Sequence, residues 1–251
     1  MKMAYRSAML LVALTGCAHT PPEDVKPVNV LFIGNSYTTT NDLPGMIGKL
    51  AEASDQLLAP TLHCEGGKPL KQQWMDGKAR DAIRNGAWTW VVMQEQSQVP
   101  SFPLEQLRTE MYPSVRWLDE IVRVRGGART LLYETWGHQQ GDRQNRPTDT
   151  YEAMQERLNL GYETIAREQK LTVAPVGRAW HLVHASHPDL PLWMDDGSHP
   201  TAAGTYLAAC VFYNVLFGRS PVDSPYLAGL DRDRAKILQQ AAADSVTGFK
   251  L

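Results

Sequence analysis

Five short apolar segments, each followed by a longer segment with helical periodicity, recur along this chain of 251 residues. The apolar segments cover residues 28–33, 60–64, 87–93, 128–135 and 171–174. Short runs of Val, Ile, Leu and aromatic residues are typical of buried parallel strands. Because parallel strands need a crossover between them, this alternation predicts an α/β fold: a three-layer α/β/α sandwich around a five-stranded parallel sheet.

The segments with helical periodicity are the longer elements. They cover residues 42–56, 71–85, 104–125, 148–170, 176–185, 200–217 and 231–245. Asn41 or Asp42 can cap the first of these helices, and Thr148 or Asp149 can cap the fourth. Pro113 marks an interruption within the third.

The first apolar segment ends abruptly at Gly34-Asn35-Ser36, which predicts a tight turn between the first strand and the first helix. A serine is therefore expected at the carboxyl end of a parallel strand. In open α/β sheets this edge is where ligands bind. Ser36 is thus either a functional hydroxyl or an ordinary turn residue.

A second pattern lies near the far end of the chain, where Asp196 and His199 stand three residues apart and Pro200 opens an apolar helix. An Asp in this position can turn back and accept the imidazole N–H. That contact fixes the tautomer and leaves the other ring nitrogen as a base. The alternative is a helix-capping Asp with an incidental histidine.

Residues 34–37 (GNSY) and 196–200 (DGSHP) together resemble the first and last conserved blocks of the SGNH (GDSL-type) hydrolases. This resemblance extends over residues 28–218. It implies Ser36 as the nucleophile and Asp196 and His199 as its triad partners. It also implies the flavodoxin-like strand order of that family. Ser36 is not in a G-x-S-x-G motif, which disfavours an α/β-hydrolase.

The same resemblance implies an oxyanion hole. The N–H of Ser36 and that of a glycine after the second strand would contribute, with Gly67 preferred and Gly66 as the alternative. The third block departs from the family, because its usual Gly-x-Asn-Asp is replaced here by residues 94–98, QEQSQ. Gln96 then stands where the Asn would donate its amide, and Gln94 is the fallback donor.

The N-terminus has the order of a lipoprotein signal peptide. Residues 1–16 combine Lys2 and Arg6 with a short apolar run that is too short to span a bilayer. They lead into Cys17, which resembles the lipidated residue of a bacterial lipobox. The sequence thus predicts a signal peptide, a tether at 17–27 and a catalytic domain at 28–251. The protein would be exported and membrane-anchored in the cell envelope, at the outer membrane if the cell is Gram-negative. A plain secretory signal with a chance cysteine is the alternative.

The remaining candidate residues are weaker. Residues 136–147 form a polar loop with Trp136, Arg143 and Arg146, which we interpret as a substrate rim or else a solvated loop. Residues 181, 184 and 187 are histidines without a partnering carboxylate motif, so a metal site is disfavoured. Cys64 and Cys210 can pair, but two free thiols are the preferred interpretation.

The sequence as a whole predicts a serine esterase that forms an acyl-enzyme and needs no cofactor or metal. Its substrates would be small-molecule or glycan esters, including O-acetyl groups on polysaccharides. The net charge of −2 gives no basic patch, so nucleic-acid binding is not expected. Two alternatives stay open. One is a non-catalytic glycan-binding lipoprotein on the same fold, and the other is a metal-dependent hydrolase built around His181.

Overall fold

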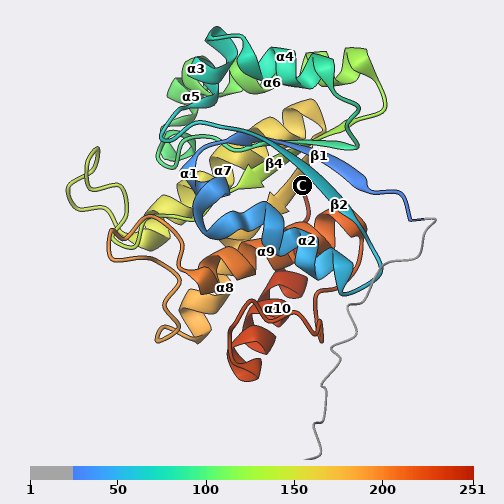
Figure 1. Ribbon diagram of the computed structural model, residues 1–251. Coiled ribbons are helices and arrows are strands. Elements are labelled where there is room, and N and C mark those ends of the chain that lie inside the picture. The colour runs from blue at the N-terminus through green and yellow to red at the C-terminus, as the bar shows by residue number, and fades with distance from the viewer. Residues whose placement is uncertain (1–24) are drawn as a thin grey trace, which may run out of the picture.

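A computed structural model describes residues 25–251, and the expected signal peptide and Cys17 lie outside the described residues. Five parallel strands form one sheet (Figure 1). They are β1 (Val28–Gly34), β2 (Leu58–Cys64), β3 (Trp90–Met93), β4 (Arg129–Glu134) and β5 (Thr172–Pro175). The order β2-β1-β3-β4-β5 is the flavodoxin-like order. The predicted three-layer α/β/α fold is therefore confirmed.

Helices cover both faces of the sheet (Figure 1). One layer contains α3 (Leu70–Met75), α4 (Lys78–Asn85), α5 (Leu104–Glu110), α6 (Tyr112–Arg125) and α7 (Tyr151–Gln169). The other contains α2 (Leu43–Glu52), α8 (Val176–Ser186), α9 (Ala202–Phe217) and α10 (Arg232–Thr247). The short elements are α1 (Ser36–Thr39), η1 (Thr40–Asp42) and η2 (Val99–Ser101).

Alternate side chains of the central strands point to opposite faces of the sheet, where they form two hydrophobic cores. Phe32 of β1 faces α9, where its ring contacts Phe212, whereas the neighbouring Leu31 and Ile33 face the opposite helical layer. Both faces of β1 are buried because each is covered by helices, which explains the continuous apolar run in the sequence. Burial of these faces supplies the main driving force for closing the sandwich.

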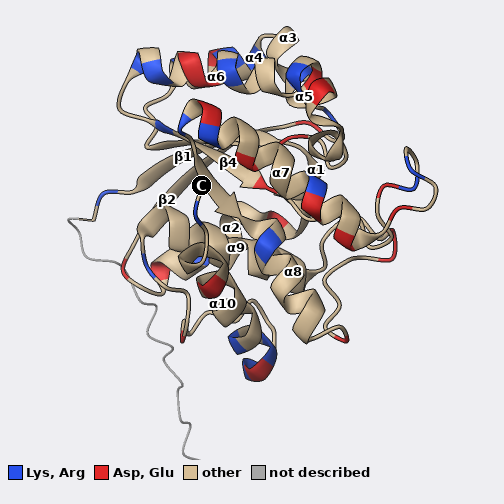
Figure 2. Cartoon of the chain, turned by 180° about the vertical axis from the view of Figure 1, so that it is seen from behind, with Lys and Arg blue, Asp and Glu red and all other residues tan. Residues whose placement is uncertain are grey.

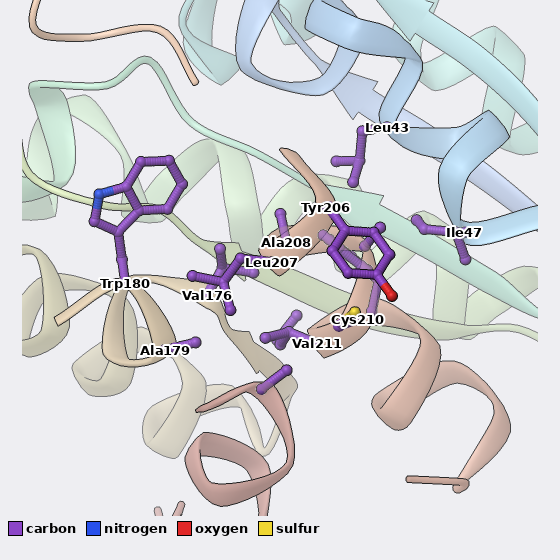
Figure 3. Packing of buried hydrophobic residues seen from close by; sticks show 14 of the residues in the cluster. Leu43, Ile47, Val176, Ala179, Trp180, Tyr206, Leu207, Ala208, Cys210 and Val211 are labelled. Carbon is purple, nitrogen blue, oxygen red and sulfur yellow. The ribbon is translucent and has the colours of Figure 1, made fainter. Parts of the chain in front are cut away.

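Helix α9 packs closely against its neighbours because its small residues allow near approach (Figure 3). Ala208, Ala209 and Cys210 are all fully buried. Cys64 is partly buried, and both Cys64 and Cys210 are free thiols, as preferred from the sequence. Among residues 25–251, none of the helices is both long and apolar enough to cross a membrane.

Two helix boundaries differ from the sequence expectation, whereas the break expected before Pro113 is present. The segment expected as one helix over 71–85 is divided by Gly77, whose φ of 83° belongs to the left-handed region. Asp42 caps α2 as predicted, but α7 is capped by Thr150, which accepts the N–H of Ala153. The interruption expected before Pro113 occurs at Met111, between α5 and α6.

Candidate active site

Ser36 is the first residue of α1, directly after the turn that ends β1. Asn35 caps this short helix by accepting the N–H of Tyr37 at 3.2 Å. Gly34 is needed at the turn, because a Cβ there would lie 2.7 Å from both Gln94 Oε1 and Thr38 Oγ1. The glycine thus lets the third-block loop approach the backbone, and the turn presents Ser36 at the carboxyl edge of the sheet.

Asp196 and His199 lie on the segment between α8 and α9, which an antiparallel bridge between Trp193 and Pro200 closes into a loop. Asp196 Oδ1 accepts the N–H groups of Ser198 and His199, both at 2.9 Å. Asp196 Oδ2 lies 2.6 Å from His199 Nδ1. His199 Nε2 lies 2.9 Å from Ser36 Oγ. The three residues expected from the two blocks are therefore brought together in hydrogen-bonding order.

The electrostatics of this arrangement favour an ionised Asp196. Partial burial opposes its ionisation, but the two backbone N–H donors and the His199 ring outweigh burial, so the pKa of Asp196 lies below its usual value. An ionised carboxylate accepts a hydrogen bond from the Nδ1–H of His199, which keeps the ring proton on that nitrogen. The lone pair of Nε2 then faces Ser36 Oγ, which is the geometry of a general base beside a nucleophile.

Two of the expected oxyanion donors are backbone N–H groups, those of Ser36 and Gly67. Within residues 25–251, the Ser36 N–H has no protein acceptor, as is usual at the start of a helix. Gly67 lies in an exposed turn with φ of 68°. The carbonyl of the following Lys68 accepts from Asn35 Nδ2 at 3.5 Å, so the turn with Gly67 lies beside the Ser36 turn.

Gln96 is half-buried and its side chain folds onto its own loop. Its Oε1 accepts the N–H groups of Gln98 and Val99, and its Nε2 donates to Gln98 Oε1 at 3.3 Å. An amide nitrogen carries two N–H groups, so this contact uses only one of them.

Gln94, the fallback donor, is excluded by its surroundings. It is fully buried, and its Oε1 accepts from the Asn35 N–H and from Thr38 Oγ1. Its Nε2 donates to Asn35 Oδ1 at 2.8 Å and to the carbonyl of Glu95. Because both ends of the amide are used inside the protein, Gln94 supports the Ser36 turn and does not face a substrate.

Glu95 is a supporting residue that sequence reasoning missed. Its Oε1 accepts the N–H of Leu70 at 2.9 Å and that of Gln96 at 2.7 Å, while its carbonyl accepts from Asn35 Nδ2 at 3.4 Å. Glu95 therefore joins the three loops that follow β1, β2 and β3. Burial raises its pKa to about 7 despite the two N–H donors. Its supporting role could not be recognised from the sequence, because acidic residues such as this one, between Gln94 and Gln96, are common in loops.

Trp136 is not part of a substrate rim, and the prediction was wrong. Its indole is fully buried and stacks between Tyr37, with ring centroids 4.5 Å apart, and Trp180, at 4.0 Å. Its Nε1 donates to the carbonyl of Ser198 at 2.9 Å. The ring is buried because Trp136, two residues after the end of β4, packs into the core on the side of the α8–α9 layer. Trp136 therefore supports the segment that carries His199.

Arg143 and Arg146 are exposed on the loop between β4 and α7, as a rim would require. The nearby His138 contacts Ser97, with Nε2 3.1 Å from Ser97 Oγ. Burial lowers the pKa of His138, although the charges of Asp142 and Asp196 act in the opposite direction.

The α8 histidines do not support a metal centre. His181 and His184 lie against the ring of Tyr151, and His187 caps the carboxyl end of the helix. In the part of the chain that the structure describes, no group of three His, Cys, Asp or Glu side chains is arranged to hold a metal ion. A cavity of about 780 Å³ lies between α8 and α10, but Ser36, Asp196 and His199 do not line it.

Comparison with solved structures places the fold among SGNH and GDSL-like hydrolases. A candidate SGNH hydrolase from Slackia heliotrinireducens is 28% identical, with a TM-score of 0.64 over 75% of this chain and 98% of that one. A DUF4886 family protein from Bacteroides uniformis is 19% identical, with a TM-score of 0.74 over 88% of this chain and 95% of that one.

A mutant of Axe2, an acetyl-xylooligosaccharide esterase from Geobacillus, is also similar. It is 18% identical, with a TM-score of 0.60 over 80% of this chain and 98% of that one. No protein-family model matches the chain, and no curated protein matches its sequence. The chain thus shares the fold of the SGNH hydrolases and is distantly similar to esterases and lipases.

Proposed function

We propose that this protein is a serine esterase that hydrolyses carboxylic esters through Ser36, His199 and Asp196. The observation that carries the proposal is the continuous contact from Ser36 Oγ to His199 Nε2, at 2.9 Å, and from His199 Nδ1 to Asp196 Oδ2, at 2.6 Å. The shared fold with SGNH hydrolases is consistent with this chemistry.

In the first half of the reaction, Ser36 Oγ bonds to the ester carbonyl carbon while His199 Nε2 takes the hydroxyl proton. Asp196 holds the ring and stabilises its positive charge. The negative oxygen would be bound by the N–H groups of Ser36 and Gly67 and by the Gln96 amide. The C–O bond to the alcohol then breaks, and His199 gives its proton to the leaving oxygen.

In the second half, water attacks the acyl-enzyme while His199 takes a proton from it. The tetrahedral intermediate collapses, the carboxylic acid leaves, and the proton returns to Ser36 Oγ. No metal or redox cofactor takes part in this scheme. Substrates would be small acyl esters or O-acetyl groups on glycans.

The test combines turnover with covalent labelling. Purified full-length protein is assayed with p-nitrophenyl acetate and treated with a fluorophosphonate probe, followed by mass mapping. We expect the probe on Ser36, and Ser36→Ala should lose both label and turnover. Ser220→Ala, which changes an exposed serine elsewhere on the surface, is the matched control and should keep both. Equal turnover in Ser36→Ala and wild type would refute the nucleophile.

A non-catalytic glycan-binding protein is the second candidate, and one observation favours it. The Gln96 side chain is bonded to its own loop through Gln98 and Val99, so the altered third block could have lost its catalytic role. This candidate predicts retention on immobilised glycans with no fluorophosphonate labelling of Ser36. The metal-dependent alternative predicts loss of hydrolysis with a chelator.

We further propose that the protein is an exported lipoprotein of the cell envelope, anchored through Cys17. The support is the signal-like order of residues 1–16 and the cysteine that follows them. In a Gram-negative cell the outer membrane is the expected location, because Ala18 follows the cysteine in place of an Asp.

A further inference from the structure

A polar cavity of about 350 Å³ adjoins the proposed triad. Residues 138–144, after β4, and residues 195–197, before α9, form most of its walls, and Gln98, after β3, completes them. The N–H of Gln139 donates to the carbonyl of Gly197 at 2.8 Å and holds the walls together. Asp196 belongs to this wall and also contacts His199 Nδ1, and His199 Nε2 lies 2.9 Å from Ser36 Oγ, so the cavity adjoins the proposed triad at its carboxylate.

The lining of this cavity is mainly polar. The side chains come from Gln98, His138, Gln139, Gln140, Asp142, Arg143, Gln144, Asp195 and Asp196, with Gly141 and Gly197 completing the surface. Amides both donate and accept hydrogen bonds, carboxylates accept them, and the guanidinium donates them. Small-ligand sites are usually lined mainly by apolar groups, and an acyl chain needs such a lining. The amide, carboxylate and guanidinium groups that line this cavity instead suit a ligand with many hydroxyl groups.

The loop that forms the cavity is held in a fixed conformation. Residues 135–150 contain no helix or strand, and loops of such length within compact domains are uncommon and usually functional. Asp142 is only 1% exposed, and it accepts from Gln98 Nε2 at 2.7 Å and from Asn145 Nδ2 at 2.8 Å. Its own N–H donates to Asp149 Oδ2 at 2.7 Å, and Arg157 pairs with Asp149 at 2.5 Å.

This internal network makes the cavity a preformed site. Backbone geometry contributes too, because Gly141 has φ of 74° and a Cβ there would lie 2.6 Å from the carbonyl oxygen of Thr150. The buried carboxylates fix the loop, while Gln140, Arg143 and Gln144 remain exposed at its tip. Figure 1 shows this loop, in yellow-green, extending beside the orange segment before α9, and Figure 2 marks its arginines in blue. A ligand that binds here need not order the loop first.

We infer that this cavity binds the hydroxyl-rich alcohol part of the ester, namely a sugar residue that carries the acyl group, while the ester carbonyl lies at Ser36. This inference rests on the proposed hydrolysis at that serine. Gln140 and Arg143 are then specificity-determining residues that contact the sugar and take no part in bond breaking.

The experiment compares two acetate esters with one enzyme. One is a partly O-acetylated xylooligosaccharide, and the other is p-nitrophenyl acetate, which has no hydroxyl group. The double variant Gln140→Ala, Arg143→Ala should lower kcat/KM for the sugar ester by about tenfold or more, mainly through KM, because each lost hydrogen bond contributes up to about a factor of ten. It should leave p-nitrophenyl acetate within about twofold, since no contact with that ester is lost.

Arg232→Ala is the control, because Arg232 is an exposed arginine at the start of α10 and does not line the cavity. We expect it to leave the hydrolysis of both substrates unchanged. Equal losses on both esters, an equal effect of Arg232→Ala, or an unchanged sugar ester in the double variant would overturn the inference. Wild-type hydrolysis of p-nitrophenyl acetate without hydrolysis of the sugar ester would also overturn it, whereas hydrolysis of neither ester would refute the proposed function itself.

Discussion

Glutamine in place of Glu134 should stabilise this protein at alkaline pH. Glu134 is the last residue of β4 and is fully buried, and neither of its carboxyl oxygens has a hydrogen-bond partner within the described residues. Arg178 Nε, 4.0 Å away, is the nearest cation that pairs with it. Burial raises the pKa of Glu134 to about 8 in spite of that cation.

The direction and size of the effect follow from proton linkage. The unfolded chain loses this proton near pH 4.5, the ordinary value for Glu, whereas the folded protein keeps it until about pH 8. Between these values the folded state binds more protons, so the free energy of unfolding falls as pH rises. Each pKa unit corresponds to about 1.4 kcal/mol, so the loss approaches about 5 kcal/mol above pH 8. Glutamine cannot ionise and avoids this loss.

The assay is urea unfolding at a series of pH values, followed by tryptophan fluorescence. The interval between pH 7 and 8 is the most informative, because Glu95, with a pKa of about 7, completes most of its ionisation there, whereas Glu134, with a pKa of about 8, still keeps much of its proton. The Glu95 contribution is the same in wild type and variant, so it cancels in their comparison. We expect Glu134→Gln to flatten the pH dependence in this interval. Glu152→Gln, which changes an exposed residue of α7, should behave as wild type. An unchanged slope in Glu134→Gln would refute the reasoning.

The remaining predictions concern the proposed site and the anchor. Gln96→Ala should lower kcat by about 100- to 1,000-fold with KM nearly unchanged, as for loss of an oxyanion donor; unaltered steady-state kinetics would contradict this. Glu95→Ala should lower kcat more than Glu95→Gln, because alanine leaves the N–H groups of Leu70 and Gln96 without their acceptor; similar kcat values for the two variants would count against it. Cys17→Ser should remove lipidation, and cell fractionation should show the protein leaving the membranes; unchanged partition with membranes would rule out lipid as the anchor.

The sequence predicted the sheet because burial on both faces leaves a direct trace in composition. Strands such as β1 and β3 are continuous apolar runs, and their limits were found within three residues. Helix ends were harder to predict. The Thr150 cap and the break at Gly77 depend on one backbone angle or one hydrogen bond, and neighbouring residues offer equally good candidates.

The meeting of Ser36, Asp196 and His199 was predictable for a different reason. The carboxyl ends of parallel strands lie at one edge of the sheet, so a motif after β1 and another before α9 can meet there. The burial of Trp136 was not predictable, because its stacking partners Tyr37 and Trp180 come from distant segments. A tryptophan in a polar loop has no local feature that distinguishes a surface ring from a core ring.

That buried tryptophan explains how the two halves of the proposed triad keep their relative position. Tyr37, directly after the serine, stacks on Trp136, and the Trp136 Nε1 donates to the carbonyl of Ser198, directly before the histidine. The Tyr37 hydroxyl also lies 2.7 Å from Ser198 Oγ. The segments that carry Ser36 and His199 are therefore both fixed to the same buried ring. Because general-base catalysis depends on a short nucleophile–base contact, this aromatic support gives the 2.9 Å distance between Ser36 Oγ and His199 Nε2 a structural cause.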